Sequence, residues 1–475
     1  MRPGPNTQAS TAIPPASSPT NTGTWFVVGP ASQGPMTPTL ITSFAQYVKI
    51  YGPRGTYAAA LFDAVEAYFS EGGSRLYVCR EFGGTAKSAE VKLKHVAEES
   101  IKVEAIGPGI WANAFKIVVA ESSGTYTITI KNAAGETLEV SPALTTVADA
   151  VAWSKASIYV IITATGTGAP TAGTFELTGG TDETAGINTA THEAALKKFG
   201  PELGPGQISL PGVTATAALE ALFKIAAEQK RRAVGDLPNH ATKAELITAA
   251  AAIRGLGAST RAGSLWGSWQ QFPPVVGTVA VRSVCPSAFV AAKCAVIDAL
   301  GNPNLPVAGK QGVLFNTLGQ ESSFTEPEVE ELYLAGVNLT KVVAGQVRLY
   351  GNRTPVNPQT DPFYVQFGNV RLDMAIEWKG LAIEENFTFS QLDGEGNDTA
   401  AYGNALKSMM LDLYKVGAVF GATPQEAFTV DTGPDVNTVA SEAESNCNAT
   451  IAARRSPGAD QVNLNIVRVS ITQEV

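Results

Sequence analysis

The stretch GVNLTKVVAGQVRLYGNRT, residues 336–354, predicts a β-hairpin. Alternate positions on both sides of a break at Ala344-Gly345 are apolar, with one lysine among them: Val337, Leu339, Lys341, Val343, Val347 and Leu349. Period-two spacing around a glycine-containing break is typical of two strands joined by a tight turn. Gly336 favours the end of a preceding helix, and Gly351-Asn352 favours a turn at the exit. The stretch holds no set of reactive side chains, so it indicates a fold and not a reaction.

The residues before this hairpin predict a helix from Thr325 to Leu334. Thr325 and Glu328 have the spacing of a capping box, and Pro327 falls in the first turn, where helices tolerate proline. The order of this helix, GVN, a strand and then R-x-Y-G-x-R-T resembles the core of contractile tail sheath proteins, the outer tube of phage tails and related injection machines. The residues of this motif are Gly336, Asn338, Arg348, Gly351 and Arg353.

Two further blocks, residues 25–80 and 400–430, resemble the same family and stand in its order. The first has a strand, the pattern G-x-A-x-x-G-P, a helix and then G-G-x-R-x-Y-V-x-R. The second has LDLYKVGAVFG, with Gly417 and Gly421, followed by EAFTV. There are two departures from the family. Only Pro3-Gly4 remains of a P-G-V-Y motif, and GVLFNTLG replaces the A-P-A-N signature before the capped helix.

Length and composition indicate a large, rather apolar globular protein. The chain has 475 residues, 44% of them hydrophobic and 16% charged, and a net charge of −9. That length predicts several domains, and the acidic balance argues against non-specific binding to nucleic acid or anionic membrane. The four cysteines, Cys79, Cys285, Cys294 and Cys447, form no CxxC pair, which favours reduced thiols in a cytoplasmic protein. We expect neither a signal peptide nor a membrane helix.

Periodicity along the chain predicts an α/β (α+β) multidomain fold. Residues 126–130, 158–163 and 174–178 suggest an inserted β-rich domain that faces outward. Helices are expected at 56–71, 216–233, 241–254 and 286–300, and a strand at 275–281. The expected divisions are an N-terminal arm (1–24), the N-terminal part of the α/β core (25–95), the inserted domain (96–186), a middle α/β domain (187–355), a C-terminal domain (356–465) and a C-terminal arm (466–475). The resemblance implies that the middle domain has a subtilisin-like fold without catalytic machinery.

The C-terminal domain is expected to contain a strand and a helix. Within residues 370–389, Ile383, Phe387 and Phe389 are interpreted as one strand face. Asp398 is expected to cap the following helix. Its inward side chains recur at steps of four and three: Tyr402, Leu406, Met409, Leu413 and Val416.

The two chain ends carry alternatives that spacing leaves open. Residues 1–23 are rich in Pro, Ser, Thr and Asn, and are either a disordered leader, which composition slightly favours, or an arm ordered by a neighbouring subunit. In residues 462–471 the apolar face changes after Ile466. This one-residue slip indicates either a β-bulge or a strand whose end pairs with another copy. The resemblance favours the second, with inter-subunit arm residues Thr24, Trp25, Val467, Val469 and Ile471.

Candidate chemistry is sparse. Asp236, His240 and Ser264 or Ser268 stand in the chain order of a subtilisin triad, but no G-x-S-x-G elbow exists. Residues 393–398, DGEGND, have part of a calcium-loop spacing without its glycine and its final glutamate, which favours a solvated turn. We expect no catalytic residue, no cofactor and no metal site.

The resemblance implies a structural role. Sheath subunits stack around an inner tail tube, lend terminal strands to their neighbours and contract to drive the tube through a host envelope. The implied partners are further copies of the chain, the tube protein, and baseplate and tail terminator proteins, with no nucleic acid and no membrane. The implied location is a virion tail assembled in a host cytoplasm. The alternatives are the sheath of a bacterial injection system and, in another class, a subtilisin-like hydrolase.

Overall fold

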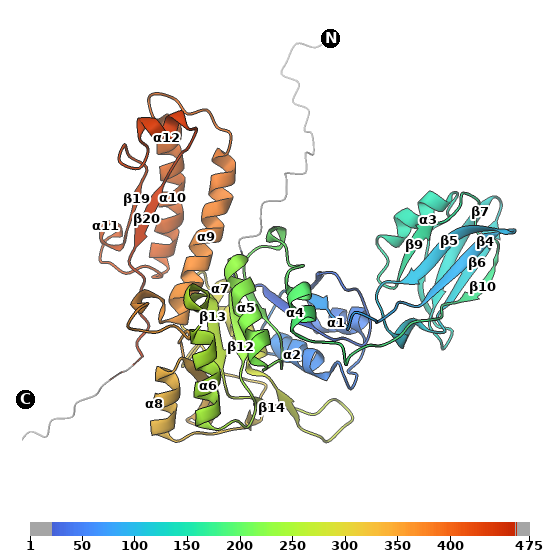
Figure 1. Cartoon of the computed structure of the whole chain (residues 1–475), viewed down its shortest axis with the longest axis horizontal. Coiled ribbons are helices and arrows are strands. Elements are labelled where there is room, and N and C mark those ends of the chain that lie inside the picture. The colour runs from blue at the N-terminus through green and yellow to red at the C-terminus, as the bar shows by residue number, and fades with distance from the viewer. Residues whose placement is uncertain (1–20, 461, 463–475) are drawn as a thin grey trace, which may run out of the picture.

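The computed structural model describes residues 21–460 and 462, which form a mixed α/β fold of several bodies (Figure 1). A central body is built on an eight-stranded sheet. A β-rich body lies to one side of it, and a helical body at the C-terminal end lies on the other. The predicted arm residues Val467, Val469 and Ile471 fall outside the described residues.

The central sheet has the strand order β18-β17-β13-β12-β11-β1-β3-β2. Its inner strands run parallel, whereas β2 and β18 at the two edges are antiparallel to their neighbours. The bounds are β1 (Trp25–Gly29), β2 (Thr39–Ile41), β3 (Leu76–Arg80), β11 (Gln207–Ser209), β12 (Arg232–Asp236), β13 (Gly263–Trp266), β17 (Val337–Val343) and β18 (Gln346–Tyr350). Strands assigned from the sequence to two domains, 25–95 and 187–355, thus share one sheet.

Strand β1 lies in the middle of this sheet, between β3 and β11. Trp25 is fully buried and Thr24 nearly so, and the Thr24 carbonyl accepts a hydrogen bond of 2.9 Å from the Gln207 amide. The prediction that Thr24 and Trp25 belong to an inter-subunit arm is therefore wrong, because their backbone partners lie in the same chain.

Helices cover both faces of the sheet, which is why β1 is apolar without interruption. Trp25 and Val27 point into one core, together with helices α1, α2 and α7, whereas Phe26 and Val28 point into the other. The helices are α1 (Phe44–Tyr51), α2 (Ala59–Ser70) and α7 (Pro286–Ala299) on the first face, and α4 (Thr189–Leu196), α5 (Thr216–Glu228), α6 (Lys243–Arg254) and α8 (Glu326–Leu334) on the second.

The hairpin of residues 336–354 is confirmed as β17 and β18. Ala344 and Gly345 both have positive φ, +51° and +76°, as a two-residue type I′ turn requires. Helix α8 begins after the expected capping box of Thr325 and Glu328.

The β-rich body spans β4 to β10 and has its own hydrophobic core. Its two sheets have the orders β4-β5-β9 and β10-β6-β7-β8. The bounds are β4 (Glu90–His95), β5 (Glu98–Ala105), β6 (Lys116–Ser122), β7 (Thr125–Lys131), β8 (Thr137–Val140), α3 (Val147–Ser154), β9 (Val160–Ala164) and β10 (Gly173–Glu176). The Arg80 guanidinium connects this body to the central one, since it donates to the carbonyl oxygens of Ala31, Gly34 and Pro108.

The C-terminal body contains helices α9 and α10 against a short pair of strands. Its bounds are α9 (Phe367–Phe387), α10 (Asn397–Lys415), α11 (Pro424–Ala427), β19 (Phe428–Asp431), α12 (Val439–Ala443) and β20 (Thr450–Ala453). The predicted strand within 370–389 is wrong. Ile383 and Phe387 also share a face at helical spacing, and Phe389 lies beyond the helix, fully exposed.

Details of α10 also differ from expectation. The helix starts at Asn397 after Gly396, whose φ is +78°, so Asp398 lies in the first turn and is not the cap. Tyr402, Leu406, Met409 and Leu413 are buried as expected, whereas Val416 is 40% exposed because the helix ends at Lys415.

The predicted strand at 275–281 is a loop. It joins β14 (Gln270–Phe272) to β15 (Arg282–Val284), which form a small sheet with β16 (Gly319–Gln320). Pro273 and Pro274 have no N–H to donate to a ladder, and Gly277 turns the chain at a φ of +85°. The predicted helix 216–233 likewise ends at Glu228, because Arg232–Asp236 forms the buried strand β12.

Candidate assembly surface

Strands β19 and β20 form a two-stranded antiparallel sheet in the C-terminal body. Phe428 lies opposite Ala453, and Asp431 opposite Thr450. Among the described residues no third strand joins this sheet. An isolated pair of strands is marginally stable, and an unpaired edge can accept a strand from another chain. The geometry therefore makes β19–β20 a candidate acceptor for an extended segment.

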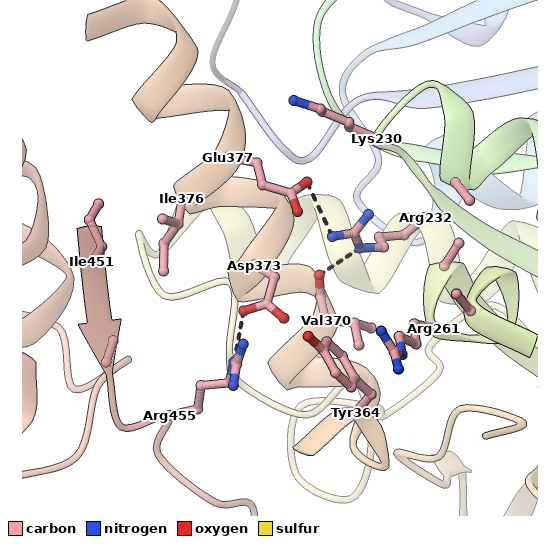
Figure 2. A pocket seen from close by; sticks show the side chains of 14 residues that line it. Lys230, Arg232, Arg261, Tyr364, Val370, Asp373, Ile376, Glu377, Ile451 and Arg455 are labelled. Carbon is pink, nitrogen blue, oxygen red and sulfur yellow. Dashed lines mark hydrogen bonds and ion pairs between the residues drawn. The ribbon is translucent and has the colours of Figure 1, made fainter. Parts of the chain in front are cut away.

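A pocket of about 490 Å³ lies beside β20, at the joint between the C-terminal body and the central body (Figure 2). Ile451 and Ala453 of β20 line one side of it, and α9 lines another. The central body contributes Arg232, at the start of β12, and Arg261. The pocket thus adjoins the candidate acceptor strand and both bodies at once.

One ion pair at this pocket lies within the C-terminal body, and another joins that body to the central one. Arg455 Nε lies 2.7 Å from Asp373 Oδ1, and Arg232 Nη2 lies 3.7 Å from Glu377 Oε2. Arg232 Nε also donates to the Val370 carbonyl at 2.6 Å. Burial lowers the pKa of Arg232, and the nearby Glu377 carboxylate partly opposes this shift. Arg232 thus links α9 to β12, and Arg455 links α9 to the segment after β20.

The structure brings together most residues of the motif in 336–354. Asn338 is fully buried, and its side-chain amide donates to the carbonyl oxygens of Leu265 and Arg353 at 3.0 and 2.7 Å. Its Oδ1 accepts from the Arg353 amide at 2.8 Å. A Cβ on Gly351 would lie 2.4 Å from Asn338 Oδ1, and one on Gly336 would lie 2.8 Å from a backbone atom of Pro355. These residues determine how β17 packs against the chain that leaves β18.

The other motif residues lie elsewhere. Arg348 lies opposite Lys341 in the hairpin and donates to Gln346 Oε1 at 2.9 Å. Gly417 lies just beyond the C-cap of α10 and has a φ of +76°, and a Cβ on Gly421 would lie 2.7 Å from the Ala427 amide nitrogen. The last two belong to the C-terminal body, so the motif is not a single site.

The hypothetical serine-protease triad is not assembled. Asp236 is buried and accepts hydrogen bonds from Ser287, by its amide at 2.8 Å and its hydroxyl at 2.7 Å. His240 is largely exposed, with Nε2 3.0 Å from Glu321 Oε2. The Ser264 hydroxyl accepts from Trp266 Nε1 at 2.9 Å, and Ser268 is buried. Asp236, His240 and Ser264 thus each contact other groups, and the buried Ser268 hydroxyl has no hydrogen-bond partner among the described residues.

The remaining candidates from the sequence are structural too. Asp393 accepts two hydrogen bonds of 2.7 Å from Asn397, which orders the turn before α10. In the part of the chain that the structure describes, no three His, Cys, Asp or Glu side chains gather as metal ligands would. Cys79, Cys285 and Cys294 are buried free thiols. Among residues 21–460 and 462, no helix combines the length and apolar character needed to cross a membrane.

No protein-family model matches the sequence, and no curated protein matches it either. Solved structures do match the fold. A sheath tail protein from Listeria innocua superimposes with a TM-score of 0.62 at 15% identity, over 87% of this chain and 89% of that chain.

Two larger assemblies give similar values. The helical sheath of the anti-feeding prophage in its contracted state has a TM-score of 0.58 at 13% identity, over 99% of this chain and 100% of that chain. The PVC sheath complex of an extracellular contractile injection system, also contracted, has a TM-score of 0.56 at 13% identity, over 100% and 99% of the two chains. The chain therefore has the fold of contractile sheath proteins along nearly its whole length.

Proposed function

We propose that this chain is the structural subunit of a contractile sheath, which polymerises helically around an inner tube and contracts to drive the tube through a cell envelope. The observation that carries the proposal is the unaccompanied β19–β20 pair, in a chain with the sheath fold along nearly its whole length. A sheet of two strands in a body of this size lacks the strands that normally stabilise it. Strands from neighbouring copies would supply them.

The C-terminal segment is the proposed donor. Val467, Val469 and Ile471 alternate as one face of a strand, and they follow the last described residues, 460 and 462. Strand addition forms backbone hydrogen bonds that depend little on sequence, with side-chain pockets for specificity. Because donor and acceptor lie on different parts of the chain, the contact is head-to-tail. Such contacts produce open helical polymers unless the rotation closes a ring.

Contraction would then be a rearrangement of packed subunits, with the shared strands keeping the copies connected. The inner tube protein, baseplate proteins and a tail terminator are the further proposed partners. In the proposed division of the chain, the inserted domain of residues 96–186 lies on the outside of the polymer. The proposed site of action is an assembled tail, with assembly in a cytoplasm and with no enzymatic step.

Electron microscopy of two matched truncations tests the proposal. Deletion of residues 467–475 removes the donor face and is expected to leave folded monomers. Deletion of residues 472–475 keeps Val467, Val469 and Ile471 and is expected to form striated tubes, as the full chain should. Normal tubes from the longer deletion would reject the assignment of the donor strand. The absence of tubes from the full chain under all assembly conditions would reject the sheath role.

The sheath of a bacterial injection system is the second candidate. It is favoured by the similarity to the injection-system and anti-feeding prophage sheaths. The two candidates share the polymer and differ in what the tube delivers. Genes beside this one that encode a capsid and a portal would indicate a phage, and their absence from an otherwise complete tail cluster would indicate an injection system.

A further inference from the structure

A second cavity, of about 700 Å³, forms a groove between α8 and the β17–β18 hairpin. Its accessible apolar surface comes from Val329 and Tyr333 of α8 and Tyr350 of β18, and the buried Val337 and Leu339 of β17 also line it. Two carboxylates of α8, Glu326 and Glu330, also line it, and Lys310 is its cationic lining residue. Glu326 pairs with Lys341 at 2.6 Å, whereas Glu330 has no ion-pair partner among residues 21–460 and 462.

The chain itself leads into this groove. Gln366 holds Gly458 by two hydrogen bonds of 2.9 Å, one to its carbonyl and one from its amide. Asp460 Oδ2 lies 3.5 Å from Arg353 Nη2. Ala459 and Asp460 line the groove directly, and Val462 just beyond is 89% exposed. The last described residues are thus fixed at the groove, and the next apolar side chain has no partner.

The residues that follow match the groove in spacing and charge. In an extended strand, Leu464, Ile466 and Arg468 lie on one face, because side chains alternate. Eight extended residues span at most roughly 26–29 Å from Asp460 to Arg468. The nine residues of α8 span only roughly 13 Å, so the segment can follow the whole helix. Its first charged side chain, Arg468, would then reach the carboxylate side of the groove.

We propose that residues 463–468 dock in the groove of their own chain, with Leu464 and Ile466 on the apolar surface and Arg468 beside Glu326 and Glu330. This inference deepens the proposed function and rests on it for the role of the residues that follow. The change of face after Ile466 then has a physical meaning. The first half of the terminal strand binds its own subunit, and Val467, Val469 and Ile471 on the other face remain available to a neighbouring copy. The groove is the attachment point of the shared strand.

Disulfide formation tests the contact. In a Cys447→Ser background, Ala308→Cys places a thiol in the groove, and Ile466→Cys places one on the docking face. The matched control replaces Ala308→Cys with Leu334→Cys, on the same helix–hairpin unit but exposed and outside the groove. We expect the 308–466 pair to form an intrachain disulfide at high dilution about tenfold faster than the control pair, because docking raises the local thiol concentration. Equal rates would overturn the inference.

Variants of Arg468 test whether the segment docks in the groove through its charge or is only tethered near it. Arg468→Glu should slow the 308–466 reaction roughly fivefold, and Arg468→Lys should retain the original rate. No effect of Arg468→Glu would overturn the predicted contact with α8. Disulfides that form only between chains, shown with copies of two sizes, would overturn docking in the same chain and assign the groove to a neighbour.

The microscopy of the full chain is an independent readout. Tubes without a preferred 308–466 disulfide reject the groove contact and leave the sheath role intact. A preferred disulfide in a chain that never forms tubes supports the groove contact and rejects the sheath role.

Discussion

The side-chain amide of Asn338 shows how one residue can determine a local fold. It bonds to Leu265 in β13 and to both backbone groups of Arg353, in the segment that leaves β18. An apolar replacement would leave these buried groups unpaired, which typically costs about 1–3 kcal/mol for each group. Gly351 is required beside it, since any side chain there would overlap the amide oxygen. The sequence motif therefore records a packing requirement and not a reactive site.

Asp236 is the residue whose ionisation should be visible in the stability of the protein. Burial is the main cause that raises its pKa to about 6, although hydrogen bonds from Ser287 and Gly212 partly stabilise the charge. The unfolded carboxyl has a pKa of about 3.9, so the folded state binds the extra proton between these values. Stability from this group therefore rises as the pH falls from 7 toward 4.

We expect Asp236→Asn to remove this dependence. Relative to the variant, the wild-type free energy of unfolding should increase by about 1.3 kcal/mol when the pH is lowered from 7 to 5, as a single group with these pKa values requires. Urea unfolding at the two pH values measures the difference. An unchanged difference, or one of opposite sign, would contradict a raised pKa at Asp236.

At the scale of elements, the hairpin could be predicted because the residues that determine it are close together in the sequence. Alternation and a two-residue turn lie within one short stretch. Strand β12 was missed because it is short, is buried on both faces and directly follows a helix, so Arg232 reads as part of that helix. The partner strands of β1 could not be read from the sequence either, since they come from opposite sides of the inserted β-rich body.

The sequence predicts a strand where α9 lies, because the contacts that select a helix there are tertiary and leave no local signal in the sequence. Ile383 and Phe387 are separated by four residues, a spacing compatible with one strand face and with one helix face. The packing against α10 selects the helix. The candidate acceptor β19–β20 was not predicted from the sequence, because a missing strand is visible in a sheet and not in a sequence.

Two glycines of the C-terminal body, Gly380 and Gly417, should respond in opposite directions to substitution by alanine. Gly380 lies inside α9, and a Cβ there meets no atom within 4 Å. Gly380→Ala should therefore stabilise the protein by up to about 1 kcal/mol through helix propensity alone. Gly417 also has open space but a φ of +76°, so Gly417→Ala should destabilise by about 1 kcal/mol. Urea unfolding followed by circular dichroism distinguishes them, and equal shifts of the same sign would contradict this account.

At the scale of the whole molecule, the β-rich body is expected to be dispensable for folding. Its core is separate from the others, and the chain enters and leaves it through adjacent segments, since Lys87 and Thr181 form a bridge. Replacement of residues 89–178 by a short Gly-Ser linker should leave the central sheet folded, because the lost contacts lie at the junction near Arg80.

Calorimetry measures this outcome. The shortened chain should lose one unfolding transition and keep the others within a few degrees. A full-length chain in which Arg80 is unchanged and only the loop at Gly135 is extended is the control for insertion effects. Collapse of all transitions on deletion would show that the bodies fold as one unit.

Helix α9 is a continuous mechanical connection between the central body and the C-terminal body. It starts in the core of the central sheet, at Phe367 and Val370, and continues without a break into the C-terminal body. Arg371 pairs with Asp298, and Trp378 donates to the Lys230 carbonyl, so the part of the helix from Phe367 to Trp378 is held against the central body. In the proposed polymer, torque applied at β19–β20 would be transmitted along α9 into the central sheet, and elastic deformation would fall mainly at the contacts between copies.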